Sequence, residues 1–224
     1  MKPTKPFAWS YTALTGFENC PHRHWRTKVV KDIADPPGEA ALFGQRAHKA
    51  LENRVKDKTP LPESMKHYEP YCKRFEGVPG QVIVEHQIAL NKQLKPTSWF
   101  AKDAWCRGVI DVGVVSGKKA LMGDWKVGKR KPDSEQMMLF AGLGFIAYPP
   151  VKVIDTTFIW LPDKKVDRET FKREDAADIW GTFLPRVKRM EMAYNDGPDA
   201  HPKKPSGLCG WCPVKDCEFW KPRR

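Results

Sequence analysis

Two acidic residues and a lysine stand in a pair of short apolar segments near the middle of the chain. The first segment, Arg107–Val115, contains Asp111, and the second, Ala120–Lys126, contains Asp124 and ends on Lys126. A short link with one glycine joins them, which predicts a β-hairpin. With a two-residue turn in this link, Asp111 lies directly opposite Asp124, about 5 Å away. Because side chains alternate along a strand, Asp124 and Lys126 share one face.

Two carboxylates and an ammonium group on one face of an apolar hairpin suit a metal-dependent reaction on a phosphate. Like charges at this distance repel each other, and burying them unpaired is costly. A divalent cation removes the conflict, and hard carboxylate oxygens favour Mg²⁺ or Mn²⁺. The lysine can then polarise a water or stabilise the charge that grows on the phosphate. Taken without other motifs, the same residues also fit a solvent-exposed hairpin with an ordinary Asp–Lys surface ion pair and no metal.

The hairpin resembles the signature of a known family. Gly-Val-Ile-Asp111 followed by Asp124-Trp-Lys126 is similar to the Asp … (Asp/Glu)-X-Lys motif of the PD-(D/E)XK nuclease superfamily. Its RecB-like branch, which includes CRISPR-associated adaptation nucleases and phage exonucleases, adds a Gly-x-x-x-His motif upstream and a Gln-x-x-x-Tyr motif downstream. The chain has Gly44–His48 and Gln136–Phe140 at these places, with phenylalanine replacing the tyrosine. Each motif is weak alone, but their order makes chance a poor explanation.

This resemblance implies a fold, a reaction and a role for each matched residue. The fold is α/β, with a restriction-endonuclease-like core (a mixed central sheet flanked by helices) and helical, cysteine-bearing terminal extensions. Metal ligands for Mg²⁺ or Mn²⁺ are His48, Asp111 and Asp124, and the catalytic residues are Lys126, Asp111, Asp124 and Gln136. Gln136 is expected to position water or backbone. The implied activity is a metal-dependent exonuclease on linear DNA, acting on single strands or 5′ ends in recombination, repair or phage DNA processing.

Two other functions stay open on the sequence. One is a non-catalytic nucleic-acid-binding protein with a zinc module, and the other is a structure-specific endonuclease of the same fold. No Gly-x-x-x-x-Gly-Lys helicase motif occurs in the chain, so we expect a stand-alone nuclease. Its partner is DNA, and a single-strand annealing protein or a helicase is a further candidate partner.

Three cysteines gather near the end of the chain, at Cys209, Cys212 and Cys217. Disulfides are disfavoured inside cells, so this spacing favours a metal and requires a fourth ligand. Nucleases of the branch named above often pair one N-terminal cysteine with such a trio around a [4Fe-4S] cluster, which makes Cys20 the fourth ligand and the cluster a structural staple. The alternative is zinc, held by four thiolates or by three with a histidine. The candidate histidines are His22, His24 and His201.

Basic residues near the hairpin are candidates for binding the DNA backbone. Lys129, Arg130 and Lys131 follow Lys126 directly, and Arg107 stands at the start of the hairpin. Phosphate contacts of this kind position DNA without reading its sequence.

Two further acidic residues are weaker candidates for the metal site. Glu52 could orient His48 from one helical turn away and Glu85 could add a carboxylate, but a surface or structural role is the alternative for both.

Hydrophobic periodicity predicts the elements that must position these side chains. Expected helices are 39–55, 65–75 and 134–147, with an interrupted helix in 8–31 and a long helical region, broken at Pro185, over 167–194. Expected strands are 81–90, 105–115, 120–125 and 151–161. We expect a single domain over 1–224, with a catalytic core at about 40–165, and with segments 8–31 and 195–224 brought together by the cysteines.

The overall composition agrees with a nucleic-acid partner. The 224 residues carry a formal charge of +12, which favours a polyanion, although an anionic membrane surface would also satisfy it. The start of the chain lacks the apolar core of a secretory signal. The longest apolar run, Met137–Ala147, is too short to span a bilayer. We therefore expect no membrane partner, and a location in the cytoplasm of a bacterium or a phage-infected cell.

Overall fold

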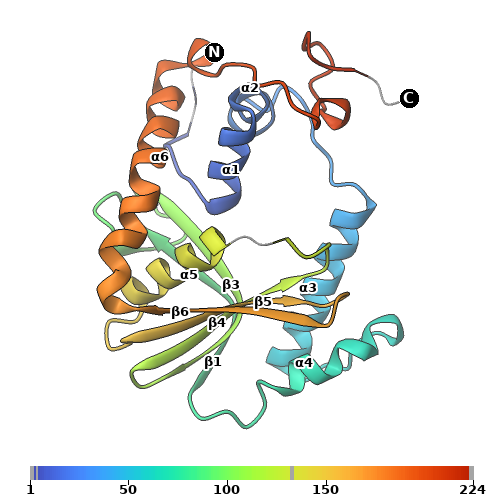
Figure 1. Ribbon diagram of the computed structural model, residues 1–224, viewed down its shortest axis with the longest axis vertical. Coiled ribbons are helices and arrows are strands. Elements are labelled where there is room, and N and C mark those ends of the chain that lie inside the picture. Colours follow the sequence, from blue (N-terminus) through green and yellow to red (C-terminus); the bar gives the residue numbers. More distant parts are fainter. Residues whose placement is uncertain (1–2, 4, 132–133, 222–224) are drawn as a thin grey trace. The chain divides into compact units, whose positions relative to one another are not determined.

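The computed structural model describes residues 3, 5–131 and 134–221, and it divides into two compact units (Figure 1). One unit comprises Pro37–Trp180 and holds the sheet. The other comprises Met1–Pro36 together with Gly181–Arg224. None of the helices in the described residues is long and apolar enough to cross a membrane.

A six-stranded mixed sheet forms the centre of the Pro37–Trp180 unit (Figure 1). Its strand order is β2-β1-β3-β4-β5-β6, and neighbouring strands are antiparallel except for the parallel pair β4 and β5. A parallel pair needs a crossover connection, which the helix α5 (Ser134–Ala147) supplies. The strands are β1 (Gln81–Leu90), β2 (Pro96–Thr97), β3 (Cys106–Ser116), β4 (Lys119–Lys126), β5 (Val153–Trp160) and β6 (Lys165–Lys172).

The predicted hairpin is confirmed as β3 and β4. Gly117 takes a left-handed φ of +55° in the turn, a conformation that costs glycine little. Ser116 pairs with Lys119, and the same register continues to Val112 opposite Gly123. Asp111 and Asp124 occupy the next opposed positions in that register. The short turn therefore fixes which residues of the two strands face each other.

Helices pack on both faces of this sheet. The helix α3 (Glu39–Asp57) buries Ala47 and Leu51 in a core cluster that also contains Val112 and Trp125. On the other face α5 buries residues 139–145, and its Met137 clusters with two aromatic side chains of β5. Burying a large apolar side chain stabilises a fold by roughly 1.5–3 kcal/mol. This packing holds the two β4 faces in fixed orientations, so Asp124 and Lys126 point away from Trp125.

Two sequence predictions about helices need correction. The predicted long helical region over 167–194 was wrong at its start, because Lys165–Lys172 forms β6 and the helix α6 runs from Ala176 to Asp196. Alternating exposure along β6 explains the strand, which pairs with β5 through all eight residues. Pro185 lies inside α6 and does not end it. The predicted helix over 65–75 is split into a 3₁₀ segment, Glu63–Tyr68, and a short α4, Glu69–Lys73.

The second unit joins the two ends of the chain. Its N-terminal part contains α1 (Tyr11–Asn19), α2 (Pro21–His24) and a π-helical turn, Trp25–Val29, and its C-terminal part contains α6 from Gly181 onwards and the cysteine-bearing tail. Arg186 donates two hydrogen bonds to the Glu18 carboxylate, at 2.7 and 2.6 Å. Fork-like contacts of this type are geometrically specific. They tie α1 to α6.

Candidate active site

His48 reaches the hairpin because α3 passes close to the end of β4. A Cβ atom on Gly44 would lie 3.2 Å from a methyl group of Val127, so a larger residue would require that side chain to shift by a few tenths of an ångström. One turn after this glycine, His48 Nδ1 lies 3.3 Å from Asp111 Oδ2. The Gly-x-x-x-His motif therefore lies where α3 is packed closely beside the end of β4.

The backbone of Trp125 orients both His48 and Asp111. Its N–H donates a hydrogen bond of 2.8 Å to Asp111 Oδ2, and the His48 ring also hydrogen-bonds to the Trp125 backbone. The indole of Trp125 is only 2% exposed in the core on the opposite face. Groups that fix the ring and carboxylate of metal ligands in this way sharpen metal binding. The buried side chain of Trp125 therefore anchors the backbone that positions His48 and Asp111.

Asp124, Lys126 and Gln136 form a closed set of polar contacts. Lys126 Nζ lies 2.7 Å from Asp124 Oδ2 and donates to Gln136 Oε1 at 2.8 Å, while Gln136 Nε2 donates to Asp124 Oδ1 at 3.1 Å. Lys126 Nζ also lies 4.5 Å from the centre of the Phe158 ring, a cation–π contact. Asp124 Oδ2 is buried and receives no hydrogen bond from the described residues, so its contact with the lysine is an ion pair. The lysine amine is held at one point by three neighbours.

Glu85 joins this site from β1. The pairing of β1 with β3 places it opposite Asp111, and the ladder is interrupted at this position between His86–Ile110 and Val84–Val112. Glu85 has a φ of +46°. This left-handed conformation costs a non-glycine residue roughly 1–2 kcal/mol. Such strain clusters at functional sites, where the surrounding structure maintains it.

His48, Glu85 and Asp111 form a group that could hold a metal ion. One ligand atom from each residue lies within 4.8 Å of the other two. Burial lowers the pKa of His48, which keeps its ring neutral and able to bind metal. Burial, followed by the charge of Asp124, raises the pKa of Asp111 to about 8, and burial followed by Glu52 raises the pKa of Glu85. Carboxylates in this state carry an electrostatic penalty that a divalent cation relieves.

The predicted metal residues are therefore placed in two adjoining groups. His48 and Asp111 belong to the possible metal group, together with Glu85, whereas Asp124 contacts Lys126 and Gln136. Glu52, considered as a partner of His48, instead pairs with Lys49 at 2.8 Å. Phe140, the residue in place of the family tyrosine, is buried in the core.

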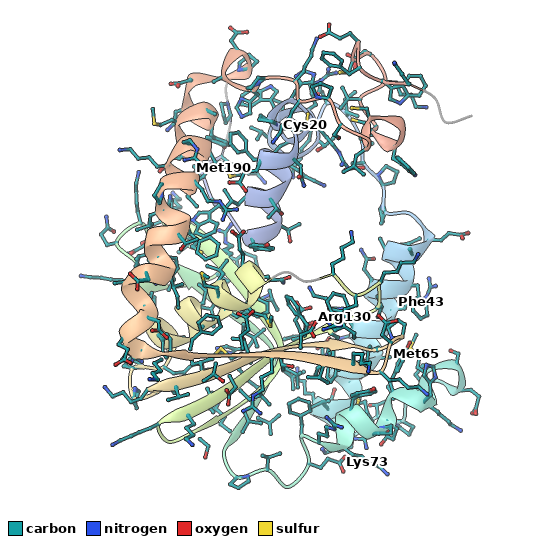
Figure 2. All side chains as sticks on the ribbon, viewed as in Figure 1. Cys20, Phe43, Met65, Lys73, Arg130 and Met190 are labelled. Carbon is teal, nitrogen blue, oxygen red and sulfur yellow. The ribbon has the colours of Figure 1, made fainter. Side chains whose placement is uncertain are left out.

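The basic residues proposed for DNA contacts differ in their surroundings. Arg107 donates to the Trp99 carbonyl at 3.0 Å and stacks over that indole. Arg130, labelled in Figure 2, bonds to the Asp167 carboxylate. Lys129 and Lys131 are exposed. The two lysines are thus better placed for phosphate contacts than the two arginines, which serve intramolecular contacts.

The four cysteines named from the sequence line one cavity in the terminal unit. Cys20 lies between α1 and α2, where Figure 2 labels it, and its sulfur accepts the N–H of Arg23 at 3.5 Å. The other three come from the tail, with a salt bridge of 3.0 Å between Arg26 and Asp216 beside them. The cysteines on the cavity wall are Cys20, Cys209, Cys212 and Cys217, all unpaired. His22 also lines the cavity, whereas His201 is buried against Trp25 and bonds to the Gly197 carbonyl.

Comparison with known proteins identifies the family. The model of the PD-(D/E)XK nuclease superfamily matches residues 8–217. The chain belongs to the PD-(D/E)XK nuclease superfamily. The fold expectation is thereby confirmed, and the superfamily implies a phosphodiesterase that acts on nucleic acid. No curated protein matches the sequence significantly.

Two solved structures share the fold. The crystal structure of SSO0001 aligns with a TM-score of 0.51 and 14% identity, covering 97% of this chain and 89% of that one. A protein from Eubacterium rectale, provisionally described as an exonuclease, aligns with a TM-score of 0.56 and 13% identity, covering 97% and 91%. At these identities the likeness shows the fold alone.

Proposed function

We propose that this PD-(D/E)XK protein is a metal-dependent DNA exonuclease that hydrolyses linear DNA. The observation that carries the proposal is the convergence of a neutral histidine, three carboxylates and a lysine on one end of the β3–β4 hairpin. The order of the RecB-like motifs in the sequence supports exonuclease over endonuclease chemistry. A formal charge of +12 agrees with a DNA substrate.

The side chains of the site fit Mg²⁺ or Mn²⁺. His48, Glu85 and Asp111 supply one nitrogen and two carboxylate donors. Asp124 adds a buried oxygen, Oδ2, which accepts no hydrogen bond from the described residues and forms an ion pair with Lys126. Hard oxygen donors of this kind suit these ions. When bound, such an ion neutralises phosphate charge and lowers the pKa of a water.

Lys126 and Gln136 have separate roles in the proposed reaction. The lysine Nζ, fixed by Asp124, Gln136 and the Phe158 ring, lies where its positive charge can stabilise a phosphate during attack. Gln136 holds both the lysine and Asp124, so it positions the pair that contacts the substrate. Lys129 and Lys131 follow in the chain and are proposed to contact the DNA backbone.

End-labelled linear DNA and covalently closed circular DNA, each with Mn²⁺, test the exonuclease proposal. We expect the linear substrate to be degraded to short products and the closed circle to persist, because an exonuclease needs a free end. Single-stranded and double-stranded linear DNA in parallel report the strand preference. Cleavage of the closed circle would show an endonuclease of the same fold, and DNA binding without any cleavage would show a non-catalytic protein.

The cysteine cavity is proposed to hold a [4Fe-4S] cluster through Cys20, Cys209, Cys212 and Cys217. All four cysteines line one cavity, as the ligands of a single metal centre must. The resemblance to the RecB-like branch favours a [4Fe-4S] cluster there, and four thiolates around one zinc ion are the alternative. The role of the cluster is to cross-link the two ends of the chain.

The pKa shifts predict how metal stabilises the protein. The folded-state pKa of Asp111, about 8, lies above its ordinary value of 3.8. In the metal-free protein, its contribution to stability is therefore complete below about pH 4 and is lost as the pH rises toward 8. Metal binding requires the carboxylate, so protons compete with it at low pH. We expect Mn²⁺ at 100 times its Kd at pH 8 to raise the Tm by about 5–10 °C at that pH. The same Mn²⁺ concentration should raise the Tm by less at pH 6, where protons weaken metal binding.

Thermal unfolding with and without Mn²⁺ across this pH range measures the effect. Asp111→Asn should abolish the Mn²⁺-dependent shift, while Asp103→Asn, a change at an exposed aspartate outside the site, should retain it. A shift of equal size at pH 6 and pH 8 would count against Asp111 as the titrating ligand.

A further inference from the structure

A cavity of about 370 Å³ opens on the sheet face opposite the catalytic side chains. Val114 of β3 and Leu121 of β4 line it. Side chains alternate between the two faces of a strand. Val114 lies three residues after Asp111 and Leu121 three residues before Asp124, so both point to the face opposite the aspartates. The strand side chains of the proposed active site point to the other face, whereas His48 comes from α3, which packs on this face.

The cavity has largely apolar walls. Tyr71 and Phe75 from the α4 region, together with Val78 and Pro79, form one side, and strand residues form the other. Val166 of β6 is 44% exposed at its edge. Thr157, also in the lining, has a buried hydroxyl with no hydrogen-bond partner among the described residues. Exposed apolar surface and an unsatisfied hydroxyl are both features of a binding site.

The polar groups of the lining are mostly cationic. Arg74 and Lys119 carry positive charge, and the charge of Arg168 is paired with Asp155, the one acidic lining residue, which also accepts a hydrogen bond from Thr170. An apolar ligand with acidic groups is therefore complementary. A second copy of this chain would bring the same cations to the interface, and like charges would oppose that pairing.

The strand β6 offers a way to bind an extended peptide next to the cavity. It is the last strand of the sheet and pairs with β5 alone, so its outer backbone groups are open in the described structure. Val166 and Arg168 of this strand both line the cavity. An extended peptide can add to a free sheet edge through its backbone while alternate side chains enter an adjoining pocket. A nucleic acid has no comparable means of pairing with the edge.

We propose that β6 and this cavity bind an acidic, extended segment of a partner protein. One apolar side chain of the segment fills the space between the α4 region and the sheet. Its carboxylates pair with Arg74 and Lys119, and its backbone continues the sheet along β6. The surface thereby docks a protein partner without blocking the catalytic face.

Fluorescence anisotropy with defined peptides tests this docking surface. The probes are fluorescein-labelled heptapeptides in which Leu, Ile, Phe or Trp alternates with Asp and Glu, and a matched set in which Lys replaces the acidic residues. We expect at least one acidic peptide to bind, with the lysine counterparts at least tenfold weaker. An unlabelled single-stranded oligonucleotide, added without metal, serves as the competitor.

Matched variants locate the binding. Lys119→Glu should weaken acidic-peptide binding at least tenfold, while Lys118→Glu, an identical charge change in the neighbouring turn and outside the lining, should not. Val166→Glu should also weaken it, because a charge replaces an apolar contact. Nuclease activity unchanged in all three variants reports that they fold. The proposal fails if no acidic peptide binds, if Lys118→Glu and Lys119→Glu act alike, or if the oligonucleotide displaces the peptide from this surface.

Discussion

Lys126→Ala is expected to lower kcat for DNA hydrolysis by at least about 10²–10³-fold, the size of effect seen when one preorganised charge-stabilising group is removed. The amine lies 2.7 Å from Asp124 and 2.8 Å from Gln136, so it is held in place before substrate arrives. The metal group of His48, Glu85 and Asp111 contains no atom of this lysine. Mn²⁺ affinity should therefore be retained, and it can rise because a competing cation beside Asp124 is gone.

Two measurements together separate a catalytic role of Lys126 from a structural one. Single-turnover cleavage rates give the loss of activity, and the Mn²⁺-dependent rise in Tm reports an intact metal site. Lys129→Ala is the matched control, because this lysine is exposed and three residues away. It should weaken DNA binding modestly and leave the cleavage rate of bound DNA unchanged. Full activity in Lys126→Ala would refute its catalytic role.

Cys212→Ser is expected to remove the metal cluster of the terminal unit and to destabilise the whole protein. The cluster would close a loop from Cys20 to the tail, and a cross-link over more than a hundred residues stabilises a fold by about 4–5 kcal/mol in the chain-entropy description. Other contacts also join the two ends, among them the paired hydrogen bonds of Arg186 to Glu18 and the packing of His201 against Trp25. Exposed ion pairs such as Arg26–Asp216, whose second member is 61% exposed, contribute about 1 kcal/mol or less. We therefore expect the variant to fold with a lower free energy of unfolding.

Metal analysis, visible absorption and urea unfolding of anaerobically purified protein measure this loss. Wild-type protein should be brown and contain about four iron atoms per chain, as a [4Fe-4S] cluster requires. Cys72→Ala is the control, since Cys72 is a buried free thiol of the sheet unit and should leave iron content unchanged. A colourless protein that loses zinc in Cys212→Ser would establish the zinc alternative. Unchanged metal content in Cys212→Ser would exclude both.

Local geometry decided which parts of the site could be predicted from sequence. The β3–β4 register followed from a two-residue turn, which leaves no freedom to slip and sets Asp111 opposite Asp124. His48 was predicted from the Gly-x-x-x-His motif of the family that the sequence resembles, at Gly44–His48. Both signals lie within a few residues of the side chains that they position.

Glu85 was predicted only as a weak candidate metal ligand, because no local signal fixes its position relative to Asp111. A loop of fifteen residues separates β1 from β3, and a connection of that length does not fix a register. The sequence therefore held no signal that Glu85 stands opposite Asp111, or that its φ is positive. The strand β6 was mistaken for helix because an edge strand carries charges on both faces, which weakens the alternation that marks a strand.

The location of bound Mn²⁺ tests the central claim, that one divalent ion is held by His48, Glu85 and Asp111 beside Asp124. Anomalous diffraction at the manganese absorption edge, from crystals grown with Mn²⁺ at pH 8, gives that location directly. We predict a peak within coordination distance of His48 and of the Asp111 and Glu85 carboxylates, and its loss in Asp111→Asn. A peak bound elsewhere, with these three side chains unliganded, would contradict the proposed active site.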